Sequence, residues 1–144
     1  MIDQNDSRSL RAAAELFFFT YRAFTSRPDR LLAERGLGRV HHRILYFVGR
    51  HPQLAVNALL GILGVSKQAL NAPLRQLVEM QLVAVEVAAH DRRVKQLSLT
   101  AAGQALEDEL TSVQTQHLAA AFAAAGSEAA AGWQQAMQAI LDQA

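Results

Sequence analysis

The chain has 144 residues, of which 51% are hydrophobic and 19% charged, so it can form one ordinary domain with a sizeable buried core. Cysteine is absent, which excludes a disulfide framework, a thiol nucleophile and a zinc site built on thiolates. No stretch supplies the roughly 20 apolar residues of a membrane-spanning helix, and the polar start lacks the apolar segment of a signal peptide. We therefore expect a soluble, cytoplasmic protein without a membrane partner.

Charge is distributed unevenly along the chain. Residues 1–50 contain nine arginines against five acidic residues, and residues 51–100 also have a net positive charge. Residues 101–144 contain five acidic residues and neither lysine nor arginine. This asymmetry favours a polyanionic partner for the first two thirds of the chain, although a solvated face followed by a helical tail would also explain it.

The first predicted element is a helix over residues 8–26. Arg27-Pro28 should end it, because the residue before a proline is disfavoured in a helical conformation, and residues 29–35 are left for one further turn. The middle of this helix has almost no polar face, so it needs apolar cover on more than one side. A second subunit would supply that cover, although a central core helix is the simpler alternative.

A helix-turn-helix is predicted next. A helix over residues 39–50 should end at His51-Pro52, and a short helix within residues 54–64 should end at Gly64, which can adopt a positive φ. Ser66 can then cap the following helix by accepting a hydrogen bond from a free backbone N–H. Two short helices joined by a glycine turn are typical of a DNA-binding motif.

The second helix of this motif has a polar stripe on its free side. Its apolar residues recur at helical spacing, and Lys67, Gln68, Asn71 and Arg75 lie on the other side. Arginine can bind guanine bidentately, and asparagine or glutamine can pair with adenine in the major groove. Any solvated helix can carry such residues, so the stripe alone does not decide between base contact and plain solvation.

A β-hairpin is predicted after this helix. Its strands should span residues 83–88 and 94–100, with residues 89–93 at the tip. Val83, Val85 and Val87 should share one face of the first strand. Arg92 and Arg93 would lie at the tip with Lys95 close behind, and arginine on a thin projection suits the narrow minor groove. The alternative is a charged tip that only protects a β edge.

Two helices are predicted at the end of the chain. Thr100 can cap the first, which should run to about Ala125, and Ser127 can cap the second after the break at Gly126. No lysine or arginine follows Lys95, so dimerisation is a better use for these helices than phosphate contact. The residues that we expect in a dimer interface are Phe17, Phe18, Phe24, Trp133 and Leu141.

The sequence resembles the MarR family of winged helix-turn-helix transcriptional regulators over nearly its whole length. The segment DRRVKQLSLTAAG, residues 91–103, matches the family's D-x-R wing followed by a strand that ends in L-T-x-x-G. The segment GVSKQALNAPLRQLVEMQLV, residues 64–83, matches the turn and the recognition helix. The resemblance implies a mainly α fold with a small β-hairpin wing.

The resemblance also implies a single domain over residues 1–144, with a winged DNA-binding part at about 36–100 and dimerisation helices at about 8–35 and 101–144. It implies a ligand-responsive repressor that binds a near-palindromic double-stranded operator as a homodimer and needs no cofactor. Asp91 and Arg93 would steady the wing while Arg92 enters the minor groove. The residues expected to contact DNA are Ser66, Lys67, Gln68, Asn71, Arg75, Arg92, Arg93 and Lys95.

A small aromatic effector is expected between the dimerisation helices and the winged part. The residues that could surround it are Tyr21, Arg22, His41, His42 and Tyr46. A cavity with apolar walls and few polar groups is the usual form of a ligand site, although each of these side chains could simply fill the core.

The sequence departs from the family pattern at three positions. Pro73 lies inside the predicted recognition helix, where it removes one backbone hydrogen bond and should kink the helix. Gln81 stands where the family commonly has a glycine that closes this helix. Ala55 stands where the family commonly has a capping serine or threonine.

Other classes of function are weaker. The sequence contains five histidines but no metal-ligand spacing, and His41 and His42 point to different helix faces because they are adjacent. No nucleophile motif or glycine-rich phosphate loop is present, so we predict neither an enzyme nor a metal site. A metal-responsive regulator and a dimeric interaction protein that has lost DNA binding remain as alternatives.

Overall fold

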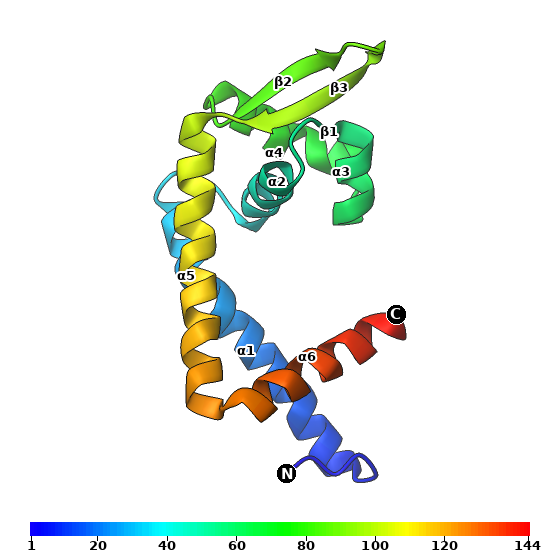
Figure 1. The fold of residues 1–144 in the computed structure, drawn as a ribbon, viewed down its shortest axis with the longest axis vertical. Coiled ribbons are helices and arrows are strands. Elements are labelled where there is room, and N and C mark those ends of the chain that lie inside the picture. The colour runs from blue at the N-terminus through cyan, green and yellow to red at the C-terminus, as the bar shows by residue number, and fades with distance from the viewer.

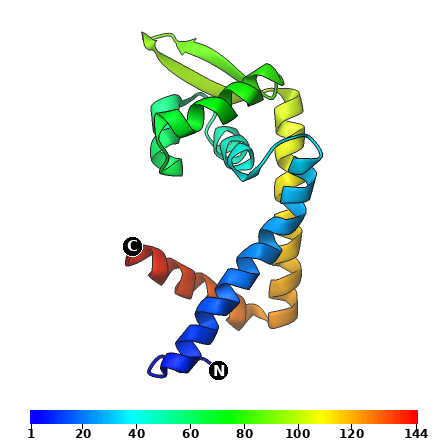
Figure 2. The same ribbon diagram turned by 180° about the vertical axis from the view of Figure 1, so that it is seen from behind.

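The structure is a computed structural model that describes residues 1–144. A winged part, residues 39–99, lies at one end of the molecule, and the helices before and after it extend away from it (Figures 1 and 2). This arrangement confirms the predicted mainly helical fold with a small β-hairpin wing. The elements in chain order are α1 Ser7–Ala33, α2 Arg39–Arg50, β1 Leu54–Ala55, α3 Val56–Leu63, α4 Lys67–Glu79, β2 Val83–Ala88, β3 Asp91–Leu99, α5 Ala101–Ala125 and α6 Ser127–Asp142.

Helix α1 is longer than the sequence predicted. It runs without interruption from Ser7 to Ala33 and contains Pro28 in its interior. The prediction that Arg27-Pro28 ends the helix is therefore wrong. Pro28 and Thr25 are both buried, and the Thr25 hydroxyl donates a hydrogen bond of 2.9 Å to the Tyr21 carbonyl oxygen. Burial of this stretch against the rest of the protein outweighs the loss of the one backbone hydrogen bond that proline cannot make.

The core lies in the winged part and extends onto the adjoining ends of α1 and α5. Helix α2 contributes Ile44, Leu45 and Val48, which recur at helical spacing on one face. Gly64 ends α3 with a φ of 64°, which confirms the predicted left-handed turn. Ala55 precedes α3 without a side-chain cap, and Gln81 follows α4 with a φ of 59°. A non-glycine residue in that conformation costs about 1 kcal/mol.

The sheet has three antiparallel strands in the order β1-β3-β2. Strand β1 was not predicted, because two residues give no periodic pattern; Leu54 pairs with Leu97 of β3. Strand β3 begins at Asp91, so the hairpin tip is Ala89-His90 and is shorter than predicted. Val83 is buried, whereas Val85 and Val87 are exposed, because the hairpin projects beyond the core (Figure 1).

Helix α5 is attached closely to the base of the wing. The Thr100 hydroxyl accepts a hydrogen bond of 3.0 Å from the Gly103 N–H and donates one of 2.7 Å to the Gln81 carbonyl oxygen. A Cβ atom on Gly103 would lie 1.9 Å from the Leu82 carbonyl oxygen. The L-T-x-x-G segment therefore caps α5 and permits its close approach to the chain at Leu82.

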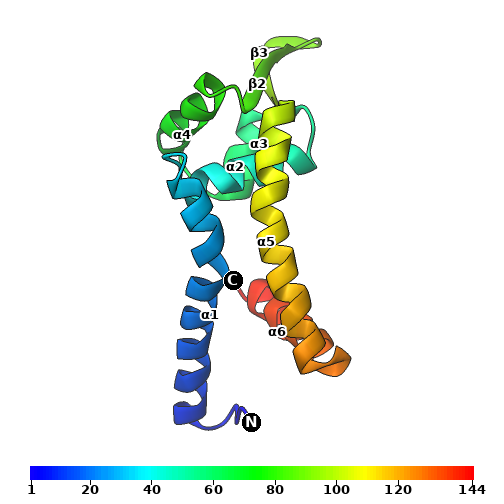
Figure 3. The ribbon, with the colours of Figure 1, turned by 90° about the vertical axis from the view of Figure 1, so that its left-hand side faces the viewer.

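The two long helices leave the winged part on separate courses, and α6 turns back from the far end of α5 (Figure 3). Gly126 precedes α6 without a side-chain cap, and Ser127 is the first helical residue, so the predicted cap at Ser127 is not formed. No helix of the chain combines the length and the apolar character that a membrane crossing requires.

Candidate nucleic-acid interface and neighbouring pocket

Helix α4 has one anchored face and one free face. Ser66 caps it, because the Ser66 hydroxyl oxygen accepts a hydrogen bond of 3.1 Å from the Ala69 N–H. Leu70 and Leu77 are buried in the core and fix the inner face. The residues predicted to contact DNA from this helix are all exposed: Lys67, Gln68, Asn71 and Arg75.

Pro73 lies in the middle of α4 but does not end it. Because proline has no N–H, the helical hydrogen bond from residue 73 to the carbonyl oxygen of Ala69 is missing. The part of α4 that carries Arg75 therefore follows a point of weakened backbone bonding. Pro73 removes no polar side chain from the free face.

The wing is stabilised by a local ion pair. The Asp91 carboxylate accepts hydrogen bonds from the Arg93 backbone N–H at 2.9 Å, from Nε at 3.2 Å and from Nη2 at 3.1 Å. The side-chain hydrogen bonds of Arg93, followed by its backbone N–H, lower the pKa of Asp91 below its usual value. Arg92 and Lys95 are exposed, and neither takes part in an ion pair of the chain.

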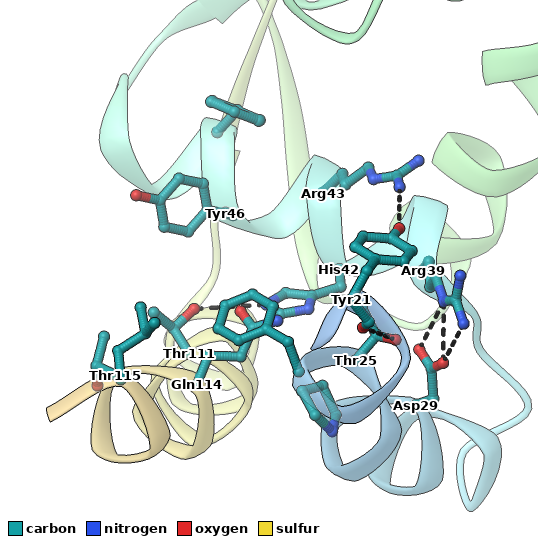
Figure 4. Close-up of a pocket in the computed structure, with 14 residues that line it drawn as sticks. Tyr21, Thr25, Asp29, Arg39, His42, Arg43, Tyr46, Thr111, Gln114 and Thr115 are labelled. Atoms are coloured by element: carbon teal, nitrogen blue, oxygen red, sulfur yellow. Dashed lines mark hydrogen bonds and ion pairs between the residues drawn. The ribbon is translucent and has the colours of Figure 1, made fainter. Parts of the chain in front are cut away.

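A pocket of about 380 Å³ lies between α1, α2 and α5 (Figure 4). Three of the five residues predicted for an effector site, Tyr21, His42 and Tyr46, line it together. Arg22 and His41 do not. The full lining is Tyr21, Phe24, Thr25, Pro28, Asp29, Arg39, His42, Arg43, Tyr46, Phe47, Thr111, Gln114, Thr115 and Leu118.

Arg22 and His41 point elsewhere for simple geometric reasons. The Arg22 guanidinium lies over the rings of Phe18 and Phe19, at 5.8 and 5.9 Å from their centroids. The pocket borders the face of α2 on which Arg39, His42, Arg43 and Tyr46 recur at helical spacing, and His41 lies to the side of that face. His41 instead contacts Gln76 of α4, with 2.9 Å between Nε2 and Oε1.

Of the two arginines that line the pocket, one has an acidic partner and the other does not. Arg39 forms an ion pair of 2.9 Å with Asp29, and its hydrogen bond to that carboxylate raises the pKa of Arg39. Arg43 Nη2 donates to the Tyr21 hydroxyl at 3.1 Å and has no acidic partner. Burial lowers the pKa of His42, whose Nε2 lies 3.4 Å from the Thr111 hydroxyl. The pocket therefore offers a guanidinium without an acidic partner and, at neutral pH, an uncharged imidazole.

Sequence reasoning missed several of these lining residues. Arg43 could have been found, because it lies three residues before Tyr46, and residues three apart share a helix face. Thr111, Gln114 and Thr115 are contributed by α5, which no local pattern connects with α2. Only the folded chain brings these helices together.

The candidate dimer residues divide into two groups. Phe24 is half-buried and lines the pocket, so it is not a free apolar surface in this chain. The other four side chains are substantially exposed: Phe17 at 49%, Phe18 at 57%, Trp133 at 43% and Leu141 at 67%. They lie on the first half of α1, which extends away from the winged part, and on α6, which turns back from the far end of α5 (Figures 1 and 3).

The histidines are not gathered into a metal site. The fold brings no three histidine, aspartate or glutamate side chains into an arrangement that could hold an ion. His41 and His42 bond to different helices, α4 and α5 respectively.

Comparison with known proteins gives consistent results. A model of the MarR family matches residues 35–94. The sequence is 44% identical over 135 residues to the HTH-type transcriptional regulator PetP of Rhodobacter capsulatus, covering 94% of this chain and 81% of that protein. The fold is similar to the S. aureus MepR–DNA complex, with a TM-score of 0.76 and 19% identity over 91% of this chain and 97% of MepR. A crystal structure of MarR matches with a TM-score of 0.68 and 18% identity, over 93% and 96% of the two chains.

Proposed function

The chain belongs to the MarR family of DNA-binding transcriptional regulators, which are not enzymes. From that premise we propose that it is a ligand-responsive repressor that binds a near-palindromic operator as a homodimer. The winged part, at about residues 36–100, binds DNA. The helices at about residues 8–35 and 101–144 form the dimer.

The observation that carries sequence-specific binding is the free face of α4. Lys67, Gln68, Asn71 and Arg75 are exposed there, and neither cation is neutralised by an ion pair. A helix of this width enters the major groove, where amide and guanidinium groups can distinguish base pairs. Ser66, at the N-terminus of α4, would lie against a phosphate. The wing would add Arg92 and Lys95 from the adjacent minor groove, while Arg93 holds Asp91.

Dimerisation is supported by the apolar side chains that this chain leaves uncovered. Phe17 and Phe18 on α1 and Trp133 and Leu141 on α6 are exposed on helices that have little core of their own. Obligate interfaces of this kind bury on the order of 2,000 Å² or more. A two-fold dimer would also present two recognition helices to successive major grooves, which is why the operator should be nearly palindromic.

Ligand response is supported by the pocket between α1, α2 and α5. Its walls combine aromatic rings with the free Arg43 guanidinium, the Tyr21 hydroxyl and the His42 imidazole. A small aromatic acid would place its ring against the apolar wall and its carboxylate on Arg43. For this effector to lower the affinity for the operator tenfold, it must bind the dimer conformation that does not bind DNA more tightly, by about 1.4 kcal/mol, than the conformation that does.

The decisive experiment is a titration of duplex DNA with the purified protein. Duplexes from the DNA next to its reading frame are compared with a scrambled duplex at two salt concentrations. We expect one near-palindromic site to bind at least about a hundredfold more tightly than the scrambled duplex. Equal affinity for all duplexes would contradict sequence-specific regulation. Absence of any binding at low salt would favour the dimeric interaction protein.

The oligomeric state is tested separately. Light scattering at micromolar concentration should give the mass of a dimer.

A further inference from the structure

A closed cycle of hydrogen bonds connects the recognition helix α4 with the chain between α1 and α2. The Gly38 N–H donates to His41 Nδ1 at 2.9 Å, and His41 Nε2 lies 2.9 Å from Gln76 Oε1. Gln76 Nε2 then donates to the Gly36 carbonyl oxygen at 3.3 Å. The cycle starts and ends in the α1–α2 connection, and Gln76 is its member on α4. We call it the Gln76 cycle.

The direction of every hydrogen bond in the Gln76 cycle is determined. A backbone N–H can only donate, so His41 Nδ1 must be the acceptor and carries no proton. The proton of the neutral imidazole is then on Nε2, which donates to the carbonyl oxygen of the Gln76 amide. The amide nitrogen of Gln76 is left to donate to Gly36. All four groups are satisfied in one consistent orientation.

The Gln76 cycle lies directly after the weak point of α4. Pro73 leaves the Ala69 carbonyl oxygen without its helical donor, and Gln76 follows three residues later, next to Arg75. Leu70 and Leu77 anchor α4 on both sides of Pro73, but apolar contacts are not directional. They set the depth of the helix in the core. Hydrogen bonds from a side chain of α4 to a separate backbone segment can also set its rotation.

The Gln76 amide is directed towards His41 and Gly36 in this arrangement. Both polar atoms of its amide are used within the chain, and the side chain is half-buried. Gln68, on the same helix, is exposed. The two glutamines therefore have different roles although they lie on one recognition helix.

We propose that Gln76 and His41 are positioning residues for DNA recognition: the Gln76 cycle holds the half of α4 that follows Pro73 in one orientation, so that Arg75 meets its base pair. The inference rests on the proposed function, because it requires α4 to contact bases. It assigns a role to His41 that differs from the ligand contact expected from the sequence.

The test uses Gln76→Met, which keeps the length of the side chain and removes both hydrogen bonds. We expect the operator affinity to fall by as much as tenfold, because ordering the released end of α4 on the operator then costs part of the energy that the two hydrogen bonds supplied, while affinity for a scrambled duplex is unchanged. His41→Phe breaks the same cycle from the other side and should give the same selective loss. Gln116→Met, at an exposed glutamine of α5, is the matched control and should leave both affinities unchanged.

Replacement of Pro73 separates positioning from general stability. Pro73→Ala restores the missing helical donor, so Gln76→Met should cost less than about threefold in that background, and a double-mutant cycle measures the coupling. An equal cost in both backgrounds, or an equal loss for operator and scrambled DNA, would overturn the inference. So would a Gln76→Met variant that binds the operator like the unmodified protein.

Failure of the proposed function gives a different pattern. If the unmodified protein binds no duplex DNA, the proposed function fails and the positioning role fails with it. If Gln76→Met unfolds, His41→Phe provides the same measurement. Relative to the unmodified protein, hydrogen exchange of free Gln76→Met or His41→Phe protein should then be faster in residues 74–80 of the chain and little changed in residues 67–72. A uniform change in exchange across α4 would contradict the inference without any use of DNA.

Discussion

The Asp91 carboxylate accepts three hydrogen bonds from Arg93 of the same strand, through one backbone and two side-chain nitrogens. Arg93 is thereby occupied within the wing, and Arg92 between the two residues is left exposed. A carboxylate near the DNA phosphates would by itself weaken binding. Its presence in the wing is explained by the conformation that it imposes on the strand carrying Arg92.

Asp91→Ala should weaken operator binding several-fold, although it removes a negative charge. The reason is that Arg92 loses its fixed direction when Arg93 is no longer held. Fluorescence anisotropy with the operator measures the effect. Glu86→Ala removes a charge from the same hairpin at an exposed residue without an ion pair and should leave binding unchanged or tighten it. Tighter binding by Asp91→Ala would contradict the role assigned to Asp91.

Lys67 and Arg75 should respond differently to replacement. Lys67→Ala is expected to weaken binding to all duplexes about equally and to reduce the salt dependence by about one unit, because a lysine on a phosphate releases counterions. Arg75→Ala is expected to cost about 1–3 kcal/mol at one operator position. Gln68→Ala is expected to behave as Arg75→Ala does. An operator preference that survives both Gln68→Ala and Arg75→Ala would contradict base contact by α4.

Gly103→Ala should destabilise the protein by about 3 kcal/mol or more, because overpacking against a backbone atom cannot be relieved by a side-chain movement. The added methyl group would lie 1.9 Å from the Leu82 carbonyl oxygen. Gly132→Ala is the control, since nothing lies within 4 Å of a Cβ there. In the interior of α6 this change should stabilise the helix by up to about 1 kcal/mol. Chemical denaturation of both variants measures the difference, and a mild effect at Gly103 would contradict the close approach.

Glu107 gives the stability a pH dependence of defined sign. Burial raises its pKa above the usual value, although the Thr111 hydroxyl donates to its Oε1 at 2.8 Å. The folded protein therefore favours protonated Glu107, and protonation stabilises the fold as the pH falls from 7 towards 4.5. A glutamine at this position cannot take up the proton.

The melting temperature of Glu107→Gln, relative to the unmodified protein, should therefore decrease as the pH falls over this range. Burial lowers the pKa of His42, so protonation of His42 destabilises the folded protein as the pH falls below about 6.5. This effect cancels in the comparison because both proteins contain His42. Glu109→Gln, at an exposed residue of the same helix, should show no such trend. A relative melting temperature of Glu107→Gln that stays constant would show that Glu107 is not perturbed.

Arg43 rather than Arg22 should bind an acidic effector. Arg43→Ala is expected to weaken the binding of an aromatic carboxylate about tenfold or more, because a hydrogen bond between charged groups contributes about 1.5–3 kcal/mol. Arg22→Ala should leave that affinity unchanged, since Arg22 lies over Phe18 and Phe19 outside the pocket. A thermal-shift screen of aromatic carboxylates and phenols, followed by calorimetry and operator titration, measures both. Equal losses in the two variants would place the ligand elsewhere.

The sequence by itself determined the elements whose signals are local. The bounds of α2, the left-handed turn at Gly64 and the caps at Ser66 and Thr100 follow from residues within four positions of one another. Asp91 and Arg93 are only two residues apart, so the ion pair that the family resemblance implied also depends on a short segment of the chain. Such features depend on backbone geometry and hydrogen bonding along the chain, which a linear pattern records.

Only the tertiary structure decided the features that depend on distant contacts. Helix α1 continues past Pro28 because this stretch is buried against the rest of the protein. The two-residue strand β1 forms because Leu54 pairs with Leu97. Packing of α5 beside α2 made the pocket, and rotation about α2 directed His42 to Thr111 and His41 to Gln76. A helical repeat shows that adjacent residues face different sides, but the partner on each side is fixed only when the elements pack together.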